Sequence, residues 1–262
     1  MSNETSSQPE KGTTRQGQWA APVNKLRVSA VPDEAVNLNV EGRQVSGPLN
    51  GFGQMWQKTY RIRFEGADVE PEEVVRVWKE KFADFWPRNN HFYGRSAKIE
   101  PGEVAVLNLS GPNGMTAPGG APVISTGIYV IYADDVSFSF MTPEGHMFAG
   151  MNTFSAFKED GKTVAQIQAL VRGSDPLFEL TLRVGFGHKM EDDFWAETLR
   201  NLAAHFGARG MPSLTRICVD PRVQWSAAGN IWHNAGIRTT MYLITTPFRW
   251  IGRKIGGKKK SA

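Results

Sequence analysis

The amino-acid sequence predicts an α+β fold in which a curved antiparallel sheet wraps around a long helix at the C-terminal end of the domain. Three observations lead to this prediction. Strand-like segments follow one another at roughly ten-residue spacing between residues 96 and 172, with short turns between them. One amphipathic helix pattern precedes these strands, and a longer one follows them. The turns leave no room for the helical crossovers that parallel strands require, so the sheet is predicted to be antiparallel.

The composition is that of a globular chain. Hydrophobic residues make up 40% and charged residues 21% of the 262 residues, which suits a packed core and excludes wholesale disorder. The single cysteine, Cys218, excludes an intramolecular disulfide and a cysteine-based zinc cluster. The sequence has no apolar run of about 18 residues, and residues 1–19 lack a signal-peptide type of run. We therefore expect a cytoplasmic protein, with peripheral contact at the inner face of the membrane as an option for its tail.

The charges divide the chain into three parts. Residues 1–50 are neutral and begin with a polar, Pro- and Gly-bearing stretch, so a mobile lead-in is predicted there. Residues 51–207 carry fifteen basic and twenty acidic residues and hold the predicted domain. Residues 208–262 carry ten basic residues and only Asp220 on the acidic side, a net charge of +9. This basic extension suggests a polyanionic partner, and a solubilising end without a partner is the alternative.

The first strand and the first helix are predicted from periodicity. Residues 54–64 alternate between apolar and polar side chains, which is typical of a half-buried strand. Residues 70–87 form a helix pattern that begins near Pro71 and ends at Pro87. Trp78 and Phe82 belong to its apolar stripe.

The middle of the domain is predicted to be an antiparallel meander, closed by a second helix. The strands are expected in the segments 96–99, 104–110, 123–132, 136–141, 146–157 and 163–172. Residues 176–185 fit either a short helical turn or a strand. Residues 189–207 predict a long helix whose apolar face includes Phe194, with Gly207 as its C-terminal cap. This helix is the natural cover for one apolar face of the sheet.

The order of elements resembles that of a known superfamily. The stretch TPEGHMFAGMNTFSAFKEDGKTVAQIQALVRGSDPLFEL, followed by the EDDFWAETLRNLAAHFG helix, is similar to the START-like helix-grip (SRPBCC) superfamily, and within it to bacterial members of unassigned activity. Members of this superfamily include lipid-transfer domains, pathogenesis-related plant proteins and polyketide cyclases. The resemblance covers about residues 54–207 and implies a hydrophobic ligand cavity between the sheet and the C-terminal helix. Catalytic members each use residues of their own, so the resemblance implies no catalytic residue here.

Candidate ligand-binding residues come from the two helices and the meander. Asn152 has the same strand parity as its aromatic neighbours and is expected to point inward with them, where its amide would bond the sheet, a water or the polar end of a ligand. Core packing is the alternative for each aromatic residue. The candidates are Trp78, Phe82, Phe138, Phe140, Phe148, Asn152, Phe154 and Phe194.

No motif in the sequence fixes a reaction. The five histidines show neither HxH nor HExxH spacing, so we expect no metal site. A GxSxG elbow, a P-loop and a complete dinucleotide fingerprint are all absent from the sequence. Acidic neighbours such as Asp192 and Asp193 point apart on a helix and are interpreted as ordinary first-turn acids. The catalytic residues stay unknown, and no cofactor is predicted.

The tail combines apolar and basic residues. Residues 231–255 interleave aromatic and aliphatic side chains with Arg and Lys, the composition of a helix that lies in a bilayer interface. Docking on its own domain or on a partner is an alternative, and nucleic acid ranks last because the body is acidic. The candidate membrane contacts are Trp232, Phe248, Arg249, Trp250, Arg253, Lys254, Lys258, Lys259 and Lys260.

Together these patterns predict a protein that holds an apolar small molecule, a lipid or polyketide-like compound, and that contacts an anionic membrane surface through its tail. Two alternatives stay open. One is an enzyme of the polyketide cyclase or aromatase kind that uses the same cavity. The other is a non-catalytic interaction module. The sequence predicts no oligomeric state.

Overall fold

The computed structural model describes residues 17–29, 31–94 and 99–257, and of residues 247–257 it describes the backbone alone. The described strands form one sheet in the order β10-β3-β9-β8-β7-β6-β5-β4, with β1 beside β6 and β2 beside β7. All pairings are antiparallel. The strands are β1 (Gln18–Trp19), β2 (Val45–Ser46), β3 (Met55–Arg63), β4 (His91–Tyr93), β5 (Val104–Leu109), β6 (Ile124–Ala133), β7 (Ser137–Pro143), β8 (Phe148–Glu159), β9 (Lys162–Gly173) and β10 (Ser213–Asp220).

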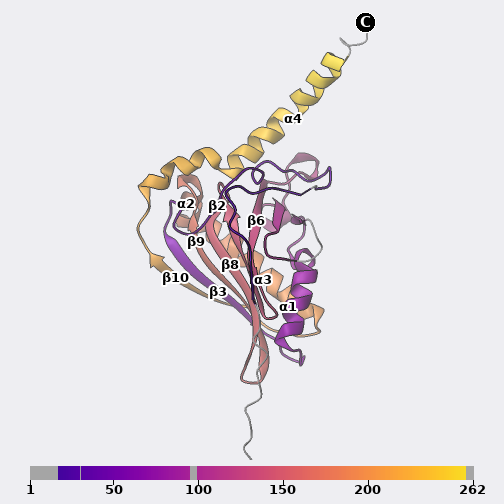
Figure 1. Cartoon of the computed structure of the whole chain (residues 1–262), viewed down its shortest axis with the longest axis vertical. Helices are drawn as coiled ribbons and strands as arrows, with labels where there is room; N and C mark the ends of the chain where they lie inside the picture. The colour runs from indigo at the N-terminus through magenta and orange to yellow at the C-terminus, as the bar shows by residue number, and fades with distance from the viewer. Residues whose placement is uncertain (1–16, 30, 95–98, 258–262) are drawn as a thin grey trace, which may run out of the picture.

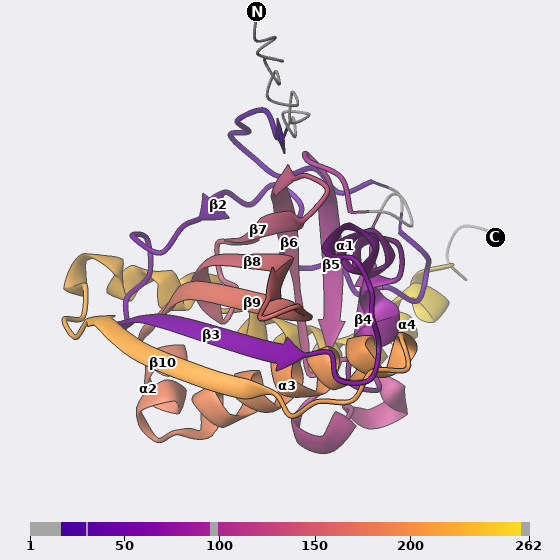
Figure 2. The ribbon, with the colours of Figure 1, turned by 90° about the horizontal axis from the view of Figure 1, so that it is seen from below.

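The sheet curves around the long helix α3, which lies along its inner face (Figure 1; Figure 2). Trp195, Leu199 and Leu202 of α3 are buried against the sheet. The predicted fold class, a curved antiparallel sheet wrapped around a long helix, is therefore confirmed. The helices are α1 (Pro71–Glu80), α2 (Pro176–Arg183), α3 (Phe186–His205) and α4 (Ala235–Gly257), with 3-10 turns η1 (Phe82–Phe85), η2 (Pro112–Gly114), η3 (Pro118–Gly120) and η4 (Trp225–His233).

Local chemistry explains where the helices begin and end. Residues 176–185, for which the sequence allowed either a short helical turn or a strand, contain the helix α2. The Asp175 side chain caps this helix by accepting hydrogen bonds from the backbone N–H groups of Leu177 and Phe178. Gly185 supplies a left-handed residue, with φ of 81°, between α2 and α3. Helix α3 begins at Phe186, three residues earlier than the predicted start at 189. Gly207, with φ of 69°, follows its end as predicted.

Both predicted extensions contribute to the fold. Strand β10, in the predicted C-terminal extension, pairs with β3 along the edge of the sheet. Leu26 and Val40, in the predicted mobile lead-in, are fully buried in a second core cluster with Val104 and Tyr129. This packing differs from a mobile lead-in over 17–50, whereas residues 1–16 lie outside the described residues. The predicted strand 96–99 also falls mostly outside them.

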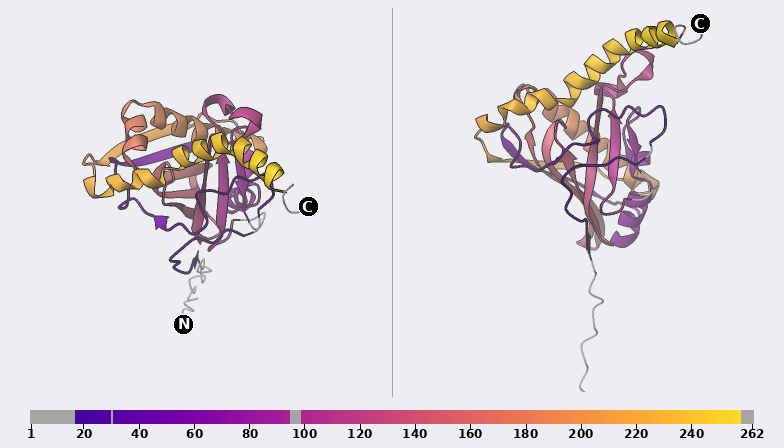
Figure 3. Two further views of the ribbon diagram at one scale, coloured as in Figure 1. Left: turned by 90° about the horizontal axis from the view of Figure 1, so that it is seen from above. Right: turned by 45° about the horizontal axis from the view of Figure 1, so that its top comes forward.

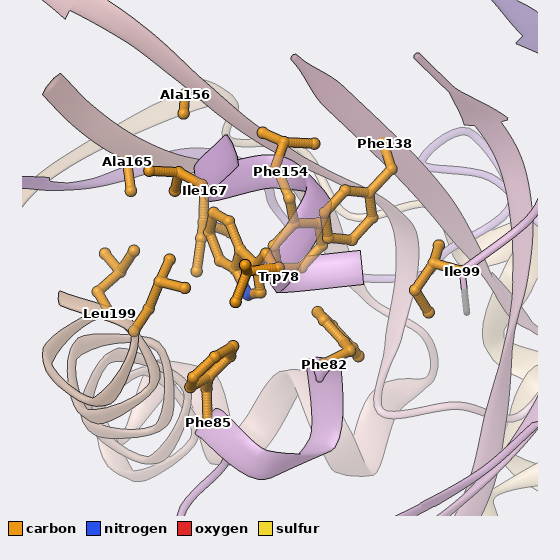
Figure 4. Close-up of a cluster of buried hydrophobic side chains, with 14 of the residues drawn as sticks. Trp78, Phe82, Phe85, Ile99, Phe138, Phe154, Ala156, Ala165, Ile167 and Leu199 are labelled. Atoms are coloured by element: carbon orange, nitrogen blue, oxygen red, sulfur yellow. The ribbon is translucent and has the colours of Figure 1, made fainter. Parts of the chain in front are cut away.

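The main core contains an aromatic cluster, which we define as Trp78, Phe82, Phe138 and Phe154 (Figure 4). Phe138 and Phe154 stack with ring centroids 4.8 Å apart. Trp78 meets both of them edge-on, at 5.8 and 5.2 Å. Helix α1 and turn η1 deliver Trp78 and Phe82, so the first helix closes one end of the curved sheet. Such edge-to-face pairs contribute about 0.5–1.5 kcal/mol each beyond the burial of their area.

Candidate ligand cavity

Next to the aromatic cluster, a cavity lies between the sheet and helices α2 and α3. Its volume is about 200 Å³. Strands β5 to β9 supply one wall, with Ile128 and Val171 among the lining residues, and the two helices supply the other, with Leu182 and Met190. The walls are mostly apolar. Typical small-molecule pockets measure roughly 300–1,000 Å³, so this cavity suits a compact ligand or one end of a longer one.

The structure divides the eight candidate ligand residues into two groups. Trp78, Phe138 and Phe154 belong to the aromatic cluster and do not line the cavity. Phe82 belongs to both regions, because it contacts the cluster and also reaches the cavity wall. The candidates that line the cavity are Phe82, Phe140, Phe148, Asn152 and Phe194.

Asn152 is a polar residue on this apolar wall. It lies on β8, where its neighbours in register are Phe140 on β7 and Ala169 on β9. Its Oδ1 atom is buried and has no hydrogen-bond partner among the described residues. The predicted inward orientation of Asn152 therefore leaves a buried amide oxygen whose hydrogen-bonding capacity no described residue uses.

A largely buried charge network lies beside the cavity. The fully buried Lys58 of β3 donates from Nζ to Glu191 Oε2 at 2.5 Å and to Asp192 Oδ1 at 2.9 Å. The Tyr60 hydroxyl donates to Asp192 Oδ1 at 2.7 Å, and Arg216 pairs with the other oxygen of Asp192. We call these five residues the charge network. Glu191 is the member that also lines the cavity.

Burial governs the protonation of this network. It raises the pKa of Glu191, and the attraction of Lys58 only partly offsets the effect. Burial would also raise the pKa of Asp192, but the hydrogen bonds from Lys58 and Tyr60 and the charge of Arg216 outweigh it and lower that pKa. Burial, with the nearby charges of Glu191 and Asp192, raises the pKa of the Tyr60 hydroxyl. Tyr60 is therefore neutral and acts as a donor.

Two buried histidines lie beside the cavity and the network. Burial lowers the pKa of His146, which lines the cavity, to about 4. Burial and the charges of Lys58 and Arg216 lower the pKa of His188 to about 4 as well. His188 packs edge-on against Trp56, with ring centroids 4.9 Å apart. Both rings are neutral at neutral pH, so neither supplies a positive charge to the cavity.

Sequence reasoning missed the charge network, although one signal was present. Lys58 has the same strand parity as Trp56, Tyr60 and Ile62, which places it on the inner face of the sheet. The predicted role of Asp192 as a first-turn acid is wrong, because α3 begins at Phe186 and Asp192 lies in its second turn. Asp193 does point away from its neighbour: it is exposed and pairs with Lys189 on the surface.

The tail docks on the body through polar contacts and leaves apolar residues exposed. Thr239 of α4 is buried and accepts a hydrogen bond from the backbone of Ser125. Asn234, just before α4, donates to Asp175 at 2.8 Å. On the solvent side, Met241 is 61% and Ile244 63% exposed, and these two lie on one helix face with the exposed Ile237. From this docked start, α4 extends beyond the rest of the molecule (Figure 3).

The structure describes the predicted membrane contacts only in part. Trp232, in η4, is 81% exposed. The other candidates within α4 have a described backbone but no described side chain: Phe248, Arg249, Trp250, Arg253 and Lys254. Lys258, Lys259 and Lys260 lie outside the described residues. Within the described part of the chain, no helix is both long and apolar enough to cross a bilayer.

The start of α4 and the cavity lie at the same end of the molecule. The backbone N–H of Ala235 donates to Gly145 at 2.9 Å, and the next residue, His146, lines the cavity. Helix α2, tied to α4 through Asp175, also carries exposed apolar residues, and Phe186 on the cavity wall is 51% exposed. Across residues 17–29, 31–94 and 99–257, no group of three or more His, Cys, Asp or Glu residues is arranged to hold a metal ion.

Comparison with known proteins finds similar solved structures. No protein-family model matches the chain, and no curated protein sequence does either. Among solved structures, protein Ms6760 from Mycobacterium smegmatis matches with a TM-score of 0.41 and 14% identity, over 63% of this chain and 96% of that one. The major latex-like protein 151 from Panax ginseng matches with a TM-score of 0.38 and 15% identity, over 59% and 99%.

A two-domain protein is also among the matches. The di-domain ARO/CYC StfQ from the steffimycin biosynthetic pathway has a TM-score of 0.44 and 10% identity, over 59% of this chain and 51% of that one. With TM-scores below 0.5, these matches do not identify an activity for this chain. The helix-grip arrangement itself is visible directly in the curved sheet and in helix α3 (Figure 2).

Proposed function

We propose that this protein binds a hydrophobic small molecule, a lipid or polyketide-like compound, in the cavity between the sheet and α3. The observation that carries the proposal is an apolar cavity whose wall holds a buried, unpartnered amide oxygen at Asn152, measured over the described residues. A space that served only packing would be filled by side chains, because protein interiors are close-packed. Apolar walls with a few placed polar groups are typical of ligand sites.

We further propose that α4 brings this cavity to an anionic membrane surface. The exposed apolar face of α4 and the net positive charge of residues 208–262 suit a helix that lies in the bilayer interface. Each Lys or Arg near an anionic surface contributes about 1 kcal/mol. Because α4 begins beside the cavity, this contact would let an apolar ligand pass between bilayer and cavity without crossing water.

Cavity filling tests ligand binding. The Val171→Phe variant places a ring in the cavity, and Val219→Phe makes the same change at a half-exposed residue of β10. Small molecules that co-purify are identified by native mass spectrometry, and naphthalene serves as an uncharged apolar probe in calorimetry. We expect binding in the wild type and in Val219→Phe, and loss in Val171→Phe. Equal binding in all three proteins, or none in the wild type, would contradict the proposal.

The same experiment separates a carrier from an enzyme of the cyclase or aromatase kind. A carrier returns its co-purified ligand chemically unchanged after incubation, whereas an enzyme converts it. Recovery of the starting compound from the wild type supports the carrier.

Vesicle flotation tests the membrane contact. The double variant Met241→Glu/Ile244→Glu places two negative charges on the exposed face of α4, and Leu214→Glu/Ile217→Glu does the same on the exposed part of β10. We expect the wild type and the β10 variant to float with vesicles that contain phosphatidylserine, and the α4 variant to stay in solution. Equal flotation of the two variants would refute the role of α4.

A further inference from the structure

Two side chains on the cavity wall end in oxygen atoms that no described residue engages. Asn152 Oδ1 is buried and has no hydrogen-bond partner among these residues. Glu191 is nine-tenths buried, and only its Oε2 is bonded within the described part of the chain, to Lys58. Both atoms are hydrogen-bond acceptors, so a ligand that complements them must present a donor.

The wall also has a defined charge. Among the described lining residues there is no Lys or Arg, and burial keeps His146 neutral, since its pKa is about 4. Glu191 is the only acidic side chain among the described lining residues, and burial raises its pKa. Within the charge network, Lys58 and Arg216 are already paired with Glu191 and Asp192. A ligand carboxylate would therefore find no free cation on the described part of this wall, and burying it there unpaired is costly in an apolar surrounding.

The wall offers a donor as well. Trp86 lines the cavity, and its Nε1 is buried without a hydrogen-bond partner among the described residues. A hydroxyl group both donates and accepts, so it complements either kind of unused group. A methyl group complements neither kind, and a carboxylate only accepts.

We infer that the cavity selects an uncharged apolar ligand that carries a hydroxyl group, whose proton is accepted on the wall by Glu191 or Asn152. The inference rests on the proposed binding function and names its ligand class: neutral phenols, enols and alcohols with an apolar body, as opposed to fatty acids and plain hydrocarbons. Glu191 and Asn152 are the specificity-determining residues.

Calorimetric titration with three probes of one shape tests the inference. Naphthol, methylnaphthalene and naphthoate share the same ring system and differ in a single substituent. We expect the wild-type protein to bind naphthol about tenfold more tightly than methylnaphthalene, the ratio that one additional hydrogen bond gives. Naphthoate at neutral pH is expected to bind more weakly than methylnaphthalene.

Two variants assign this selectivity to the wall. Asn152→Leu removes the amide and is expected to reduce the preference for naphthol severalfold. Glu191→Gln replaces the only acidic group of the described wall by a neutral amide that can donate a hydrogen bond, and is expected to raise the affinity for naphthoate. Asn201→Leu is the matched control, because Asn201 lies on the same helix as Glu191 and bonds the backbone of Phe85 outside the cavity wall. It should keep the wild-type ratios.

The outcomes separate this inference from the proposed function. Equal affinities of the wild type for naphthol and methylnaphthalene, or tightest binding of naphthoate, would overturn the hydroxyl selectivity and leave ligand binding in place. No binding of naphthalene or of any of the three probes would overturn both. If Asn152→Leu does not fold, the affinity ratios of the wild type and the naphthoate affinity of Glu191→Gln still test the inference.

Discussion

The aromatic cluster and the cavity lie under one sheet and against one helix, yet the first is filled with side chains and the second is not. Strands β7 and β8 contribute to both. Phe138 and Phe154 stack in the cluster, whereas Phe140 and Asn152, a pair in register, face the cavity. The residue types on the inner face are similar at both ends, so the strands alone do not explain the difference.

The covering elements explain it. Over the filled end, α1 and η1 insert Trp78 and Phe82 between the sheet and α3. Over the other end, α2 and the first turns of α3 cover the sheet, and they line the remaining space with residues such as Thr181 and Gly187. Whether an inward-facing aromatic residue belongs to the core or to the cavity wall therefore depends on the element that lies opposite it. The comparison predicts different costs for truncation at the two ends.

The largest effect is expected in the filled end. Trp78→Ala should lower the free energy of unfolding by about 4 kcal/mol, because Trp78 is 0% exposed and its removal leaves a void beside the stacked rings of Phe138 and Phe154. Phe186→Ala, on the half-exposed cavity wall, should cost about 1 kcal/mol or less. Urea denaturation measures both. Equal losses would mean that the two ends are packed alike.

The next largest effect on stability is expected in the charge network, which is the largely buried part of the cavity end. Lys58→Met should cost about 3 kcal/mol, since it leaves the buried Glu191 without its cation. Lys58→Met/Glu191→Leu removes both partners and should recover most of this loss. Urea denaturation of the single and double variants checks the coupling. A double variant as unstable as Lys58→Met would show that the pair is not the source of the cost.

A fall in pH should destabilise the cavity end more than the filled end. The pKa of His146 is about 4 in the folded protein and 6.5 in a model peptide, so the unfolded chain takes up a proton first as the pH falls. The stability held by neutral His146 is complete above about pH 6.5 and is lost as the pH falls from there to about 4. We expect a loss of about 2 kcal/mol by about pH 5. His188 acts in the same direction.

His146→Gln isolates this effect, because the other titrating groups stay in place. The pH dependence of its unfolding free energy should be flatter than that of the wild type. Hydrogen exchange under mild acid should rise first in the turn before β8. Identical slopes in the two proteins would contradict the assignment to His146.

The sequence predicted the filled end better than the cavity end. Alternating residues and short turns identified the strands, and helical spacing identified α1 and α3, because these patterns are local. Strand β10 was missed because residues 213–220 are mostly exposed and lie at the edge of the sheet, so no buried face imposes alternation. The buried lead-in residues Leu26 and Val40 depend on contacts with β5 and β6, which are distant in the sequence.

The cavity wall was predictable residue by residue but not as a site. Strand parity pointed Phe140, Phe148 and Asn152 inward, as the structure places them. Whether an inward residue meets another side chain or open space is decided by α1 and α2, whose positions no local pattern gives. The partnership of Lys58 with Glu191 spans 133 residues of sequence and is set by tertiary packing.

The smallest expected effect has the opposite sign. Asn152→Leu should raise the free energy of unfolding of the ligand-free protein by about 1 kcal/mol, because it replaces a buried amide oxygen that no described residue satisfies with an apolar group of similar size. The Asn201→Leu control should lose stability, since Asn201 donates to Phe85 at 3.0 Å. Thermal unfolding without added ligand compares the two variants. A polar residue that costs stability on the cavity wall is explained if its amide bonds what enters the cavity. A destabilised Asn152→Leu would instead mean that the amide supports the fold, and the contrast between the two ends would lose its functional meaning.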